Sequence, residues 1–95
     1  MAILFLAPRN VQRDAYFGDL KALAAKHIDE YTAVPIDVVG VGEDAAEEAF
    51  DLTNNPYRQE ERELKYGRGR SLSVGDIVQS NGEKFLCMSC GWEKM

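Results

Sequence analysis

The dipeptide Asn81-Gly82 lies between two apolar runs and restricts the fold of this chain more than any other feature. Asn-Gly accommodates the positive φ angles of a type I′ turn, whose twist suits a two-residue β-hairpin. The flanking runs 76–80 and 83–88 then pair with Val78 opposite Phe85. Both faces of this hairpin carry apolar side chains, so we expect it to join the main sheet or to be covered on both sides.

Upstream of the hairpin, strand patterns and helix patterns alternate. The run 2–7 is continuously apolar and is followed by a proline, which favours a strand buried on both faces and central in a sheet. Apolar residues recur every three or four positions over 13–28 and predict a helix. β-Branched residues over 31–41 predict a second strand. Because proline lacks a backbone donor, Pro35 indicates that this strand lies at a sheet edge or begins after the proline. A short second helix is expected at about 44–54.

The remaining segment, 57–70, is highly charged. We expect it to be an exposed, partly mobile connection with one helical turn at 60–66. The element order is then β-α-β-α-β-β. A chain of 95 residues makes a single domain, 1–95. The fold class is α+β, with two helices on one face of a mixed sheet of about four strands that ends in the C-terminal hairpin.

Charge and hydropathy restrict the partners of the chain. Its formal net charge is −5, whereas nucleic-acid binders rely on lysine and arginine to displace counterions, so a general DNA or RNA binder is disfavoured. An acidic surface instead suits a partner with a basic surface. No apolar run reaches the roughly 18 residues that span a bilayer, and the apolar start is too short for a signal peptide. We therefore expect a cytoplasmic protein with no membrane partner.

Cys87 and Cys90 stand in a Cys-x-x-Cys-Gly sequence, which can supply two thiolates to zinc. Tetrahedral zinc needs four ligands and His27 is the only histidine, so a complete site would need His27 plus a carboxylate, or a second chain, as in a zinc-linked dimer. A redox pair needs its first cysteine at a helix N-terminus, and here a strand precedes it. We expect no metal and no cofactor, with both cysteines as small half-buried side chains.

No nucleophile is evidently paired with His27, which lies near the end of the predicted first helix. A hydrolytic triad is therefore not indicated, and we expect a protein that is not an enzyme. The histidine is expected to cap the helix or to lie on the surface, where a cationic imidazole would suit the helix dipole.

Two charged groups are candidates for binding a partner. Glu47, Glu48 and Asp51 would lie along the outward side of the second helix, with no cationic neighbour at helical spacing. The second group combines basic and aromatic residues of 57–70: Arg58, Arg62, Tyr66, Arg68 and Arg70. The acidic face would dock a basic partner, and the basic segment would contact nucleic acid. Either group also fits a plain solvated surface.

The run 69–78, Gly-Arg-Ser-Leu-Ser-Val-Gly-Asp-Ile-Val, and the later pair Gly91-Trp92 resemble the YodL-like domain family. That family carries a similar Ser-Leu-Ser-Val-x-Asp-Val-Val stretch, and its second strand ends in glycine followed by an aromatic residue. Residues 49–54 are similar to the short helix, ending in asparagine, that precedes the stretch in related proteins. The resemblance covers about the C-terminal half and brings no catalytic residues. Because relatives occur in phages, plasmids and integrative elements, it implies an accessory protein of a mobile element that manages a bacterial host.

The same run has a structural explanation. Ser71 and Ser73 can bond local backbone amides and shape a turn, while Gly75 permits a bend. Asp76 can accept hydrogen bonds from nearby amides. We therefore expect the run to form a tight entry into the hairpin.

These observations and the resemblance together predict a non-enzymatic phage or mobile-element accessory protein that binds a host protein in the bacterial cytoplasm. One role expected of such a protein is to inhibit a host defence complex, in the manner of an anti-CRISPR or anti-restriction protein. One alternative is a nucleic-acid-associated regulatory module that uses the 57–70 segment. The other is a zinc-linked dimer through Cys87 and Cys90.

Overall fold

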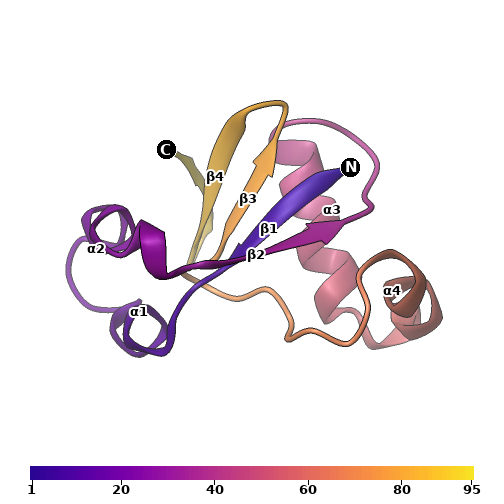
Figure 1. Ribbon diagram of the computed structural model, residues 1–95, viewed down its shortest axis with the longest axis horizontal. Coiled ribbons are helices and arrows are strands. Elements are labelled where there is room, and N and C mark those ends of the chain that lie inside the picture. Colours follow the sequence, from indigo (N-terminus) through magenta and orange to yellow (C-terminus); the bar gives the residue numbers. More distant parts are fainter.

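One five-stranded sheet forms the centre of the fold in the computed structural model, which describes residues 1–95 (Figure 1). The strands are β1 (Ala2–Leu6), β2 (Thr32–Ile36), β3 (Ile77–Ser80), β4 (Glu83–Met88) and β5 (Gly91–Lys94). The α-helices are α1 (Arg9–Asp14), α2 (Leu20–Lys26), α3 (Glu43–Asn54) and α4 (Gln59–Lys65). Short 3₁₀ turns at Ile28–Glu30 and Pro56–Arg58 precede β2 and α4.

The strand order is β2-β1-β3-β4-β5, and every neighbouring pair is antiparallel. The α+β class is confirmed, but the sheet is antiparallel with five strands rather than mixed with about four, and it packs against four α-helices rather than two. The connection between β1 and β2 explains why these two strands run antiparallel. The helices α1 and α2 bring the chain back to the end of β1 that it left, so Thr32 begins β2 opposite Leu6 (Figure 1).

The strands β3 and β4 form the hairpin that the Asn81-Gly82 dipeptide predicts. The φ angles of these two residues are 54° and 77°, as a type I′ turn requires. Val78 faces Phe85, as predicted, and the pairs Ile77–Leu86 and Ser80–Glu83 follow in the same register. Because β3 is the middle strand of the sheet, the hairpin joins the main sheet.

The strand β5 is absent from the expected fold. The chain reverses after Met88, and Gly91, with a φ of 93°, begins β5 opposite Met88. The tight reversal has no Asn-Gly or Asp-Gly signal, which explains why the sequence pattern misses it. The strand forms one edge of the sheet.

The predicted helix over 13–28 is wrong, because two shorter helices occupy this part of the chain. They are separated at Gly18, which has a φ of 70° and so cannot continue a right-handed helix. Asp19 then caps α2 by accepting a hydrogen bond from the amide of Ala22 at 3.2 Å. Tyr16, which the helical pattern places inward, is 69% exposed in the connection.

The predicted strand over 31–41 is shorter than expected and is an edge strand, as Pro35 indicates. Beyond Ile36 the backbone leaves the sheet, because the amide of Asp37 donates to the carbonyl of Lys65 at 2.9 Å. Val39 and Val41 therefore lie exposed in the connection to α3.

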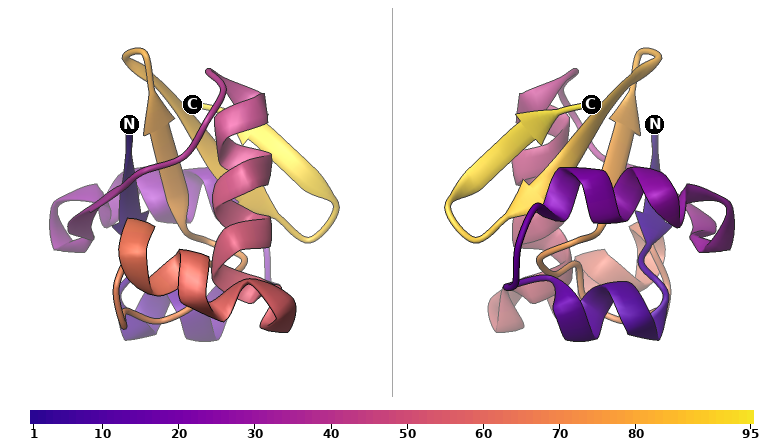
Figure 2. Two further views of the ribbon diagram at one scale, coloured as in Figure 1. Left: turned by 90° about the vertical axis from the view of Figure 1, so that its right-hand side faces the viewer. Right: turned by 90° about the vertical axis from the view of Figure 1, so that its left-hand side faces the viewer.

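Helices cover both faces of the sheet, whereas the sequence pattern predicts one covered face (Figure 2). One core lies between the sheet and α3: Ala2, Leu4, Ile36, Val38, Ala45, Ala46, Ala49, Leu52, Leu72, Val78, Phe85 and Cys87. The other lies against α1 and α2: Ala7, Val11, Ala15, Leu20, Ala24, Ile77 and Leu86. Strand alternation divides neighbouring residues between the two cores, so Ile77 faces one and Val78 the other.

Candidate partner-binding surface

The helix α3 carries the acidic candidates on its outward side. Its inner side packs on the sheet through a run of small and apolar residues: Ala45, Ala46, Ala49, Leu52 and Thr53. This leaves Glu47 and Asp51 exposed and Glu48 half-buried. The periodicity of the helix therefore places the three carboxylates as the sequence pattern predicts.

The expectation that these acids lack a cationic neighbour is wrong for Glu48 and Asp51. The turn at Pro56–Arg58 folds Arg58 back onto α3, where its guanidinium lies 2.7 Å from Glu48 and 2.7 Å from Asp51. It also contacts Glu61 of α4 at 2.8 Å. Hydrogen bonds from Arg58 and then Lys65 lower the pKa of Glu61 to about 2. These acids therefore belong to a network that holds α4 against α3.

Glu47 has no ion pair within the chain, and neither do Glu43 and Asp44. Glu43 and Asp44 lie in the first turn of α3, where the helix dipole favours a negative charge. Glu47 lies beyond that turn, so neither the dipole nor a nearby cation stabilises its carboxylate. It is the acidic residue of the candidate face that the fold leaves without a partner.

A groove lies between α3 and β5, beside Glu47. Its volume is about 210 Å³ and its lining consists of Glu47, Phe50, Cys87, Met88, Ser89, Gly91 and Trp92. The rings of Phe50 and Trp92 meet edge to face, with centroids 6.5 Å apart and planes at 87°. We call this site the α3–β5 groove. It combines aromatic walls with one unpaired carboxylate.

The sequence pattern misses this groove. It predicts an inward Phe50, whereas the ring is 40% exposed because it reaches past the edge of the core to Trp92. Trp92 lies on β5, a strand that is not expected. The pair Gly91-Trp92 is the one local indication that residues 91–94 form regular structure. It does not predict that these residues contact α3.

The basic candidates of 57–70 are mostly engaged inside the fold, in and around α4 rather than in a plain connection. Arg62 donates to the carbonyl of Thr53 at 2.9 Å and to the carbonyl of Gly69. The hydroxyl of Tyr66 donates to the carbonyl of Arg70 at 2.7 Å, and burial raises the pKa of this phenol. Among the candidates, Arg68 is left with an 89% exposed side chain. The segment therefore presents less free positive charge than its sequence indicates.

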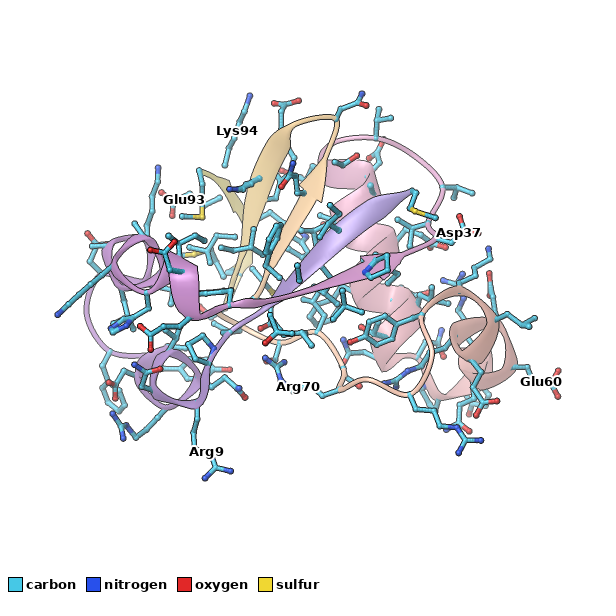
Figure 3. The ribbon with its side chains drawn as sticks, in the orientation of Figure 1. Arg9, Asp37, Glu60, Arg70, Glu93 and Lys94 are labelled. Carbon is cyan, nitrogen blue, oxygen red and sulfur yellow. The ribbon has the colours of Figure 1, made fainter.

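Arg70 lies beneath the sheet, beside the loop that leads to β3 (Figure 3). Its guanidinium donates to the fully buried carboxylate of Asp76 at 2.7 and 2.8 Å. Asp76 also accepts from the amides of Ala7, at 2.7 Å, and Ser73, at 2.8 Å. The hydroxyl of Ser71 donates to the carbonyl of Thr53 at 2.6 Å and does not accept from a local amide as expected. The expected tight entry into the hairpin is confirmed at Asp76. It ties the end of β1 to the start of β3.

The expectation that both cysteines are half-buried is wrong, because one is buried and the other is exposed. Cys87 is 3% exposed and Cys90 lies on the surface. Burial, and then the negative charges of Asp76 and Glu47, raise the pKa of the Cys87 thiol to about 12. A thiol that resists ionisation is a poor metal ligand. No group of three or more His, Cys, Asp and Glu side chains is arranged to hold a metal ion.

His27 ends α2 and lies beside the carboxylate of Glu30 and, at 3.5 Å, the amide of Asn10. These neighbours give it a structural place between α1 and α2. None of them is a nucleophile that the ring could activate.

Comparison with family models, with curated proteins and with solved structures returns no match for this chain. The resemblance to the YodL-like domain family therefore stays a prediction. None of the helices has both the length and the apolar character needed to cross a bilayer.

Proposed function

We propose that this chain is a non-enzymatic accessory protein of a phage or mobile element that binds a basic surface on a host protein in the bacterial cytoplasm. The specific role that we propose is inhibition of a host defence complex, of the anti-CRISPR or anti-restriction type. The observation that carries the binding proposal is the unpaired carboxylate of Glu47 at the rim of the α3–β5 groove.

The charge distribution supports an acidic rather than a basic interface. The net charge is −5, and the arginines of the 57–70 segment are largely bound to acids and carbonyls of the chain itself. A nucleic-acid partner would need such cations to be free. An acidic surface with an open apolar groove instead attracts a basic protein partner and can then bury apolar surface against it.

The test is capture of proteins from a bacterial lysate on the immobilised chain, followed by mass spectrometry. We expect a basic protein to be captured at 0.1 M salt and largely lost at 1 M, where the screening length falls from about 10 to about 3 Å. The variant with Glu43→Gln, Asp44→Asn and Glu47→Gln should capture much less of it.

A matched control is the variant with Glu60→Gln and Glu63→Gln, which neutralises acids of α4 away from the groove. Figure 3 shows Glu60 projecting from the body of the molecule. Circular dichroism verifies that both variants fold. Equal capture by the wild type and the groove-side variant, at both salt concentrations, would contradict the proposal.

A further inference from the structure

We infer that the α3–β5 groove receives an arginine side chain of the partner. This inference rests on the proposed function, because it names the group that a protein partner would place on this surface. Three features carry it: the free carboxylate of Glu47, the aromatic residues of the lining, and the absence of a lysine or arginine among the lining residues.

The groove carries a negative charge that no cation of the chain neutralises, and this charge would attract a cation from a partner. Glu47 has no ion pair, although it lies at the rim of the groove. No lysine or arginine lines the groove. Lys94 of β5 contacts Glu83, and Lys21, on α2 across the sheet from α3, lies 3.7 Å from Glu93. A cation supplied by a partner would meet no competing positive charge of the chain in an ion pair with Glu47.

The aromatic walls favour a flat cation. Phe50 and Trp92 both line the groove, and their rings meet edge to face at 87°. A guanidinium stacks on the face of an aromatic ring, and its paired N–H groups match the two oxygens of a carboxylate. Glu47 and Phe50 are three residues apart on α3, which makes them neighbours on the helix surface. One arginine can therefore reach the carboxylate while it contacts a ring.

The apolar lining distinguishes arginine from lysine. The ammonium group of lysine is a strongly hydrated point charge, whereas the guanidinium is weakly hydrated and enters an apolar site more readily. The methylene stem of arginine would contact Cys87 and Met88 of β4. A neutral apolar side chain could fill the same space, but it would leave Glu47 without a partner.

The experiment titrates the isotope-labelled chain with an end-blocked Gly-Ser-Arg-Ser-Gly peptide and follows amide and indole resonances by NMR. The chain has one tryptophan, so the indole N–H of Trp92 reports on the groove without overlap. We expect saturable shifts with a dissociation constant on the order of 1 mM. The same peptide with citrulline, a neutral isostere of arginine, should bind about tenfold more weakly, because the ion pair and most of the cation–π attraction are lost.

Variants of the chain test each feature. Glu47→Gln should weaken binding of the arginine peptide about threefold, as expected for an exposed ion pair, whereas Glu60→Gln should leave the affinity unchanged. Phe50→Leu keeps the groove apolar and should also weaken binding, with the Gly91 amide and the Trp92 indole as reporters. Peptides with lysine in place of arginine should bind more weakly than the arginine peptide.

Equal affinity for the arginine and citrulline peptides, or no movement of the Trp92 indole at 10 mM peptide, would overturn the inference. Both results are measured on the wild-type chain and do not depend on any variant folding. If the arginine peptide shows no preferential binding at the groove while lysate capture still depends on Glu43, Asp44 and Glu47, the proposed function stands and the arginine site in the groove is wrong. If neither the peptide titration nor the lysate capture gives the expected result, both the arginine site and the proposed function are contradicted.

Discussion

Asp76 shows how one buried carboxylate can organise a junction between distant segments. Its two oxygens accept hydrogen bonds from the amides of Ala7 and Ser73 and from both terminal nitrogens of Arg70. The Arg70 guanidinium also donates to the carbonyl of Ala7 at 3.1 Å. The carboxylate is fully buried, so its charge is tolerated only because these donors surround it.

We predict that Arg70→Ala destabilises the protein by about 3 kcal/mol, because removing one partner of a buried pair leaves the other charge unpaired. Asp76→Ala should lower the free energy of unfolding by at least as much, since it also leaves two backbone amides without an acceptor. Urea unfolding followed by circular dichroism measures both. The control is Arg68→Ala, whose exposed side chain should change the free energy of unfolding by less than about 0.5 kcal/mol. A loss below about 1 kcal/mol for Arg70→Ala would mean that the pair is not structural.

Tyr31 gives the molecule a sensitivity to alkaline pH. Its hydroxyl donates to the carbonyl of Gly75 at 2.6 Å. Burial, and then the charge of Asp76, raise the pKa of Tyr31 to about 12. In the unfolded chain a tyrosine ionises near pH 10. Between these values the folded state holds the extra proton, so the free energy of unfolding decreases as pH rises.

We therefore predict that wild-type stability declines from about pH 10 towards pH 12, and that Tyr31→Phe has a shallower decline over the same range. The buried Cys87 thiol, with its pKa also raised to about 12, contributes equally to both proteins and does not affect the comparison. Urea midpoints at half-unit pH steps provide the measurement. Parallel pH profiles for the two proteins would show that Tyr31 is ionised equally easily in both states.

At the scale of elements, short-range signals predict the structure well where one local rule decides it. The Asn81-Gly82 turn sets both the hairpin and its register, because each residue of a two-residue loop has a defined backbone conformation. The predicted helix over 13–28 fails for the opposite reason. Its apolar period is real, but Gly18 and the capping acid Asp19 divide it into two helices. Gly18 and Asp19, rather than the apolar periodicity, therefore determine where the helices end and begin.

We predict that Gly82→Ala destabilises the hairpin by about 1 kcal/mol, because alanine at a φ of 77° carries the strain of the left-handed region. An added Cβ at Gly82 would meet no atom within 4 Å, so the loss reports on the backbone alone. Gly82→Asn is the matched control, since asparagine tolerates this conformation and should cost less. Equal losses for the two variants in thermal unfolding would argue against a type I′ turn.

At the scale of the whole molecule, the candidate site depends on contacts that no local pattern contains. The acidic stripe of α3 could be predicted from helical period, but its charge balance depends on Arg58, which reaches back after a proline turn. The groove likewise needs Phe50 and Trp92, which come from distant parts of the chain, to meet. Helical periodicity therefore predicts which charged side chains lie on a surface. It does not predict which of these charges are neutralised by ion pairs in the folded chain.

The two cores are coupled through the strands that they share. Adjacent residues of β3 divide between them, with Ile77 facing α1 and α2 and Val78 facing α3. Leu86 and Phe85 of β4 divide in the same way. Loss of one helical layer would expose one face of the strands that support the other layer, so the protein should unfold in a single transition.

We predict that Val11→Ala, a fully buried change on α1, lowers the free energy of unfolding by about 2 kcal/mol. It should shift the urea midpoint equally for far-UV circular dichroism, which follows the whole chain, and for Trp92 fluorescence, which follows the opposite face of the sheet. Arg9→Ala on the same helix is the control, since this side chain projects away from the body of the molecule (Figure 3) and should leave both midpoints in place. A Trp92 transition that stays at the wild-type midpoint while the dichroism transition moves would show that the α1–α2 layer unfolds by itself. The α3–β5 groove would then persist without that layer, and partner binding would survive its loss.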